Sequence, residues 1–288
     1  MEFDQYPFVH TAFKLNGTTP CPFTGGYNMN AFYANGSLVC HDLLSMRFES
    51  ECDRGSGIVF NFRKSECTPR LDSSKVKDNQ SPLFHTQCVT HWTYGDFTFI
   101  ILQLVEDEDK HFCLRTVDPM NNIREAHLWL KVNCDMSPNL GTDSSQNYIQ
   151  LKLEKRLVSS TCFDELDFCE GTNICEGETR QYCSQKCNQC RTENQIGQCA
   201  FQEEFRGRWI DSGKDADISI EVESYSVKAG ILGSYECLNL QSEEHRDKKV
   251  LLQLYSNGCV PRYACVEMTK ATSSVMKFRL GDRINWPL

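Results

Sequence analysis

Short runs of apolar and β-branched residues, separated by polar turns, dominate the hydrophobic pattern of this chain. Seven runs are rich in Val, Ile, Phe, Tyr and Leu, and clusters of Gly, Asn, Asp and Ser stand between them. They span residues 57–62, 96–105, 126–132, 148–153, 217–222, 249–255 and 275–280. A spacing of about ten residues is typical of a meandering antiparallel sheet or barrel. Helical periodicity is weak, and residues 164–168 are the best helix candidate.

The strand-like runs fall into two groups. We expect a mainly β fold in which two disulfide-stabilised antiparallel β modules, sandwich or barrel-like, occupy residues 1–157 and 199–288. A small cysteine-rich connector, residues 158–198, lies between them. The connector has few large apolar residues, so hydrophobic burial alone would not fold it and cross-links must contribute. Residues 71–81 and 136–146 have loop composition.

The 288 residues contain 17 cysteines, which points to an oxidising compartment and a disulfide framework. The N-terminus lacks a secretory signal pattern. Together with the odd count, this leads us to expect an interior piece of a secreted precursor, with the C-terminal module truncated. All cysteines are disulfide candidates: Cys21, Cys40, Cys52, Cys67, Cys88, Cys113, Cys134, Cys162, Cys169, Cys175, Cys183, Cys187, Cys190, Cys199, Cys237, Cys259 and Cys265.

Local spacing favours a few pairings without deciding them. Cys52 with Cys67 is the most natural local bridge, because it would close a turn and the adjacent strand. Cys259 and Cys265 could bridge each other, or reach Cys199 or Cys237, and Cys199–Cys237 is one plausible pair. The six connector cysteines allow fifteen connectivities.

Three patterns suggest metal or redox chemistry, and each has a simpler interpretation. Cys183-x3-Cys187-x2-Cys190 resembles half of a zinc site or a redox motif, but it lacks a second pair and a βαβ context, which favours disulfides. His85 and His91 should share a strand face, yet no third ligand accompanies them. The acidic run at residues 106–109 lacks the spacing of a calcium loop and is typical of a solvated turn. We therefore predict no metal and no cofactor.

Charge narrows the classes of partner. A net charge of −9 and a pI near 5.3 disfavour nucleic acid and anionic membrane surfaces. No segment approaches the roughly 18 apolar residues that span a bilayer, so we expect no direct membrane insertion. Three Asn-x-Ser/Thr sequons, at Asn16, Asn35 and Asn79, are glycosylation candidates; Pro82 weakens the last.

A weak internal repeat relates the two large regions. Cys-x-Phe, Gly-x-aromatic and Gly-Ser-x-x-Cys recur in order from Cys21 to Cys40 and from Cys199 to Cys237, and a looser copy runs from Cys88 to Cys113. In each copy we expect a glycine at a strand start, a core aromatic, and a cysteine on a returning strand that supplies the bridge.

The motifs at residues 21–27, 49–67 and 199–210 resemble those of invertebrate extracellular multi-domain proteins built from tandem cysteine-rich domains of unknown function. The resemblance covers nearly the whole chain and implies a secreted or cell-surface protein of tandem disulfide-linked modules. It carries no catalytic residues.

These observations favour a non-enzymatic interaction or structural module of a secreted or cell-surface glycoprotein, with a protein or glycan partner. The first alternative is a lipocalin-like carrier of a small apolar ligand, suggested by Gly207-x-Trp209 at a strand start. The second is an extracellular enzyme. Its catalytic residues would have to be dispersed along the chain, because no catalytic motif is present.

Overall fold

The structure is a computed structural model of the chain. It describes residues 17–40, 46–69, 81–117, 123–136, 140, 148–156, 169, 175–176, 183, 186–187, 199–211, 219–229, 233–238, 248–255 and 257–282. The chain divides into two compact units, Met1–Leu157 and Val158–Leu288, which we describe separately.

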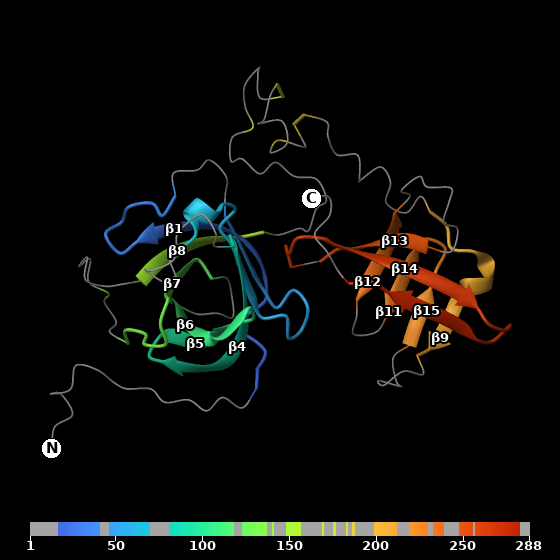
Figure 1. Cartoon of the computed structure of the whole chain (residues 1–288), viewed down its shortest axis with the longest axis horizontal. Coiled ribbons are helices and arrows are strands. Elements are labelled where there is room, and N and C mark those ends of the chain that lie inside the picture. The colour runs from blue at the N-terminus through green and yellow to red at the C-terminus, as the bar shows by residue number, and fades with distance from the viewer. Residues whose placement is uncertain are drawn as a thin grey trace. The chain divides into compact units, whose positions relative to one another are not determined.

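The N-terminal unit is a closed antiparallel barrel of eight strands (Figure 1). Each strand pairs with its neighbour in sequence, and β8 returns to pair with β1, so no edge is left open. A 3-10 helix, η2 (Ser65–Cys67), follows β3. The strands are β1 (Gly25–Tyr33), β2 (Met46–Ser50), β3 (Ile58–Asn61), β4 (Leu83–Tyr94), β5 (Phe97–Leu104), β6 (Asp107–Val117), β7 (Glu125–Trp129) and β8 (Tyr148–Lys155).

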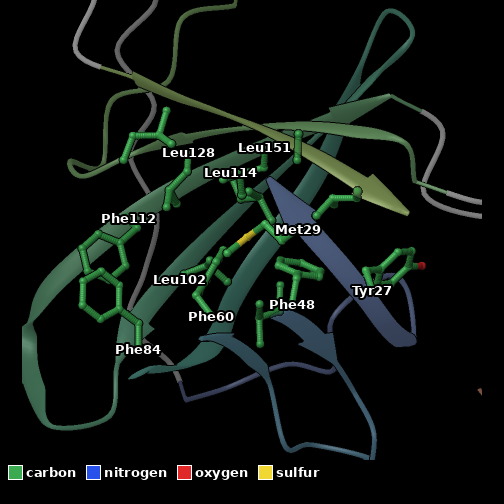
Figure 2. Packing of buried hydrophobic residues seen from close by; sticks show 14 of the residues in the cluster. Tyr27, Met29, Phe48, Phe60, Phe84, Leu102, Phe112, Leu114, Leu128 and Leu151 are labelled. Atoms are coloured by element: carbon green, nitrogen blue, oxygen red, sulfur yellow. The ribbon is translucent and has the colours of Figure 1, made fainter. Parts of the chain in front are cut away.

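Side chains fill the barrel interior. Alternate residues of every strand point inward, as the twofold period of a strand requires, and Figure 2 labels several of these side chains, among them Met29, Phe48 and Leu114. Their rings form a continuous series of contacts with centroids 5.2–6.4 Å apart. The series runs through Phe23, Phe48, Phe60, Phe62, Phe84 and Phe112.

The C-terminal unit is a seven-stranded antiparallel sheet in the order β15-β14-β13-β12-β11-β10-β9, curled into a half-barrel. Its strands are β9 (Gly207–Ile210), β10 (Ser219–Val222), β11 (Ser226–Ala229), β12 (Ser234–Leu238), β13 (Lys248–Gln253), β14 (Arg262–Lys270) and β15 (Met276–Leu280). The 3-10 helix η6 (Glu203–Phe205) precedes β9 and contacts β14. Phe201 and Phe205 are buried in its core.

The fold is all-β, as the hydrophobic pattern predicts. Each of the seven predicted runs coincides with a strand, although the bounds differ by a few residues at most. The other eight strands, β1, β2, β4, β6, β9, β11, β12 and β14, carry a weaker apolar pattern because they include more polar residues. The helix candidate at 164–168 lies outside the described residues. So do almost all of loop 71–81 and most of loop 136–146 and of the connector.

Disulfides hold both units and the segment between them. The bridges in the described residues include Cys21–Cys88, Cys40–Cys67, Cys113–Cys134, Cys169–Cys183, Cys175–Cys187 and Cys199–Cys237. The predicted pair Cys199–Cys237 is therefore confirmed. Cys162 and Cys190 lie outside the described residues.

Two of the suggested pairings, Cys52 with Cys67 and Cys259 with Cys265, are wrong. Cys67 ends η2 and lies beside Cys40, with Cα atoms 5.0 Å apart, so it is not available to Cys52, which is itself disulfide-bonded. Cys265 is a free, exposed thiol, because the alternation of β14 turns it to the outer face of the sheet.

The repeat has a structural counterpart, although one of its cysteines was assigned wrongly. Gly25 and Gly207 each begin the first strand of their unit with the same φ of 126°. The cysteine that precedes each first strand bonds to the fourth strand: Cys21 to Cys88 in β4, and Cys199 to Cys237 in β12. The equivalent of Cys237 is thus Cys88 and not Cys40.

Candidate functional site

Aromatic side chains gather on the outer side of the barrel, over strands β4 to β8. We call this group the outer aromatic face; it consists of Trp92, Tyr94, Phe97, Phe99, Arg115, His127, Trp129 and Tyr148. Their strands present them on one side because Trp92 lies opposite Phe99, Tyr94 opposite Phe97, and Trp129 opposite Tyr148 in the sheet register. These rings form a second apolar cluster outside the barrel interior, in which Phe99, Trp129 and Tyr148 are buried.

A bulge in β4 decides which residues reach this face. The register shifts between Cys88 and Thr90, so side chains after the bulge change sides relative to those before it. Trp92 therefore turns outward, where its ring stacks on Phe99 at 5.4 Å between centroids. The same bulge overturns the expectation that His85 and His91 share a face: His85 pairs with the outward Val59, and His91 with the inward Ile100.

Arg115 joins the two halves of the outer aromatic face. Its side chain is almost fully buried, and its guanidinium carbon lies 4.1 Å from the centre of the Phe97 ring and 6.0 Å from that of Trp129. Nη1 donates a hydrogen bond of 3.0 Å to the carbonyl of Asp135. Burial lowers the Arg115 pKa, opposed by the nearby charge of Asp135. The side chain remains a cation held between rings.

His127 lies at the other end of the face, against Trp129 and Tyr148. Burial lowers its pKa to about 4, and the positive charge of Arg115 acts in the same direction, whereas Glu125 opposes both. The ring is therefore neutral at physiological pH. Its Nε2 lies 3.2 Å from a Glu125 oxygen that also accepts a hydrogen bond from Gln150, which fixes the orientation of the ring.

The open part of the face is a cross-strand row at one end of the barrel. Tyr94, Phe97 and Val117 lie opposite one another on β4, β5 and β6. Tyr94 is 60% exposed and Val117 is 49% exposed. Next to this row, Val132, Met136 and Leu140 pack on the deeper rings, and the bridge Cys113–Cys134 holds that segment to β6. The row is thus an apolar strip on a rigid support, exposed at Tyr94 and Val117 and half-buried at Phe97.

In the C-terminal unit, the concave side of the sheet forms an apolar trough. Ten apolar side chains from β10 to β15 surround a cavity of about 20 Å3, which has room for about one water molecule. Trp209, whose motif suggested a ligand carrier, packs beside this trough, and its Nε1 donates a hydrogen bond to the Phe205 carbonyl at 2.8 Å. The lining residues are Ile220, Val227, Ala229, Tyr235, Leu251, Val266, Met268, Met276, Phe278 and Leu280.

Of the three sequons, only Asn35 lies in the described residues. It is exposed in the turn that follows β1, and its Oδ1 accepts hydrogen bonds from the amide and the hydroxyl of Ser37, the sequon's acceptor serine. Asn16 and Asn79 lie outside the described residues. Glycosylation at the three sites stays a prediction.

The motifs that suggested metal or redox chemistry are structural in the residues described. Cys183 bonds to Cys169 and Cys187 to Cys175, so neither offers a thiolate to zinc. The acidic run at 106–109 begins in the two-residue turn between β5 and β6, which consists of Val105 and Glu106. It continues into β6, where Asp107 pairs with Leu104. The outer aromatic face was missed from the sequence because its members come from five strands and the β4 bulge sets their side.

Comparison with known proteins identifies one region. Residues 195–286 match the domain of unknown function DUF7043. No curated protein and no solved structure matches the chain. The DUF7043 match contains the whole curled sheet with its trough, and the barrel with its outer aromatic face lies outside it. In part, this bears out the resemblance to proteins built from domains of unknown function.

Proposed function

We propose that the chain is a non-enzymatic interaction module of a secreted or cell-surface protein, which binds a partner through the outer aromatic face. The observation that carries the proposal is the strip in which Tyr94 and Val117 are exposed on either side of the half-buried Phe97. Neighbouring exposed apolar side chains of this kind are a feature of binding surfaces. Disulfides in both units indicate an oxidising environment, which supports the extracellular assignment. Among the described residues, no helix has the length and apolar character to cross a membrane.

The composition of the face favours a protein partner. Tyr is among the residues most enriched where binding energy is concentrated at protein interfaces, and Tyr94 is 60% exposed. Here the rings are fixed by mutual stacking and by the buried Arg115, so little order has to be imposed on binding.

The test uses the full chain, secreted and labelled, and measures its binding to cells of the source organism by flow cytometry. We expect saturable binding that trypsin treatment of the cells abolishes. The double variant Tyr94→Ser/Val117→Ser should weaken it at least about tenfold, because both residues would enter the interface. Tyr225→Ser is the matched control, since Tyr225 is 49% exposed in the C-terminal unit.

Equal binding by wild type and the double variant would contradict the assignment of the face. Binding that survives trypsin and is lost on glycosidase treatment would make the partner a glycan instead. A hydrolytic or transferase activity of the purified chain, abolished by one side-chain substitution, would favour the enzymatic alternative.

Carriage of a small apolar ligand is the second candidate, because the trough beside Trp209 is lined by apolar side chains. Its present volume supports this function less well: a site for a small molecule usually has roughly 300 Å3 or more, whereas this cavity has about 20 Å3. The closed barrel is filled by its own rings. Titration with a fluorescent fatty acid distinguishes carriage from partner binding.

A further inference from the structure

The two units close their sheets differently, and the number of strands explains why. In the barrel, eight antiparallel strands leave β1 and β8 running in opposite directions, so they pair with each other. In the C-terminal unit, the seven described strands are joined by six antiparallel pairings. An odd number of antiparallel strands leaves the outermost two, β9 and β15, running in the same direction. They cannot complete an all-antiparallel barrel by pairing directly, and an eighth strand would do so.

The side chains next to this opening are incompletely covered. In the barrel, inward residues of β1 and β8 such as Met29 and Leu151 have no exposed surface. In β15, the inward Met276, Phe278 and Leu280 are only partly buried, and so is Trp209 in β9. These residues pack against the core of the unit, and those of β15 also line the trough. An additional strand with apolar inward side chains would cover them.

The backbone of β15 also presents hydrogen-bonding groups at this edge. The amide of Gly281 donates to the carbonyl of Cys265, and that of Ala271 to the carbonyl of Val275. Hydrogen-bonded and non-hydrogen-bonded pairs alternate along an antiparallel ladder. The N–H and C=O groups of Met276, Phe278 and Leu280 therefore point away from β14. A strand added at this edge would exchange hydrogen bonds with these three residues.

Three of the four outward side chains that flank the opening are basic, and the fourth, Ile210 on β9, is apolar and 78% exposed. Arg208 on β9 and Lys277 and Arg279 on β15 are all exposed. On the outer face of the neighbouring strands, Glu221 of β10 lies opposite Arg208, and Glu267 of β14 lies opposite Arg279. A strand added at the opening would lie directly beside Arg208, Lys277 and Arg279, so acidic residues on its outward side would be favoured.

We propose that the DUF7043 region accepts an extended segment of another polypeptide chain as an eighth strand between β9 and β15, with apolar residues alternating with acidic ones. This site is separate from the outer aromatic face. Main-chain pairing at a sheet edge supplies affinity in this type of recognition, and alternate side chains supply specificity.

The test measures binding of a fluorescent peptide, Glu-Val-Glu-Leu-Glu-Val-Glu-Leu with blocked ends, to the full secreted chain. Three control peptides separate the contributions. In the first, the same residues are reordered so that alternation is lost. In the second, Lys replaces Glu. In the third, the Val and Leu amides are N-methylated, which removes the donors that would face β15. We expect each to bind at least about tenfold more weakly than the parent peptide.

Protein variants locate the site. Phe278→Asp places a charge on the inward side of the edge and should weaken binding by about tenfold or more. Val275→Asp is the matched control, because Val275 is an exposed apolar residue of the same hairpin outside the predicted pairing; its binding should change less than about twofold. The N-methylated peptide keeps the test valid should Phe278→Asp fail to fold.

The proposal is overturned if the parent and N-methylated peptides bind equally, or if neither binds. Binding of a fatty acid by a chain that ignores the peptide would also overturn it, in favour of ligand carriage. These outcomes do not depend on Tyr94 or Val117, so failure here is distinguishable from failure of the proposed function.

Discussion

Gly57 is a residue at which the barrel depends directly on the absence of a side chain. It lies immediately before β3 with a φ of +73°, and a Cβ there would be 2.0 Å from the carbonyl oxygen of Thr86 in β4. The neighbouring carboxylate of Glu51 accepts a hydrogen bond from its amide. The approach of two backbones, and not the turn alone, thus demands glycine.

We predict that Gly57→Ala lowers the free energy of unfolding by about 3 kcal/mol or more, because positive φ and a backbone clash add. Gly55→Ala is the control: Gly55 has a φ of +81° but nothing within 4 Å of the added Cβ, so it should cost only about 1 kcal/mol. Urea unfolding of both variants measures the difference. Equal losses would show that conformation alone matters.

His127 should make stability depend on pH. Burial lowers its pKa to about 4 in the folded protein, whereas an unperturbed histidine ring has a pKa of 6.5. Between these values the unfolded chain binds more protons, so unfolding becomes easier as pH falls from about 6.5 towards 4. The loss is up to about 3 kcal/mol and is absent above pH 7.

The measurement compares urea unfolding at pH 7 and pH 4.5 for wild type and His127→Gln, which retains a donor for Glu125. The variant should lose less stability on acidification than wild type. His85→Gln is the control, because His85 is half exposed. A pH dependence identical in wild type and His127→Gln would be inconsistent with a neutral buried imidazole.

At the scale of elements, each unit has a disulfide that joins the segment before its first strand to its fourth strand. In the C-terminal unit, Cys199–Cys237 spans 38 residues, and removing a cross-link over a loop of that length costs about 4 kcal/mol. We predict that Cys199→Ala/Cys237→Ala lowers protection from hydrogen exchange in β9–β12 and leaves β1–β8 unchanged. Cys265→Ala, at a free thiol, should change neither. Loss of protection in the barrel would contradict the division into two units.

The strands differ in how far their sequence predicts them. Runs such as Phe97–Leu104 are strongly apolar and identify themselves. β6 begins with the polar residues Asp107, Glu108 and Asp109 at its exposed end, and three consecutive polar residues hide the alternation of apolar and polar positions that marks a strand. The bulge in β4 leaves no recognisable signal, since it depends on register with β5. The repeat was visible from cysteine and aromatic placement, yet which cysteine closes each copy depends on strand order.

At the scale of the whole molecule, disulfide bonding predicts a small number of free thiols. Fourteen of the fifteen cysteines in the described residues are bonded, and Cys265 is free. With Cys162 and Cys190 outside the described residues, the denatured, unreduced protein should show at most three thiols per chain to Ellman's reagent, and Cys265 should react in the native state. A larger number would contradict the oxidising environment.

The sequence by itself determined the class of fold and the disulfide-rich character. These properties depend on local alternation and composition, which can be recognised in the sequence itself. The tertiary structure alone decided that one sheet closes with eight strands while the seven described strands of the other leave an opening, and that rings from four strands gather on the same side as Arg115 of a fifth. Both results depend on strand register and strand number, because contacts between residues far apart in the sequence form only when the sheet is assembled.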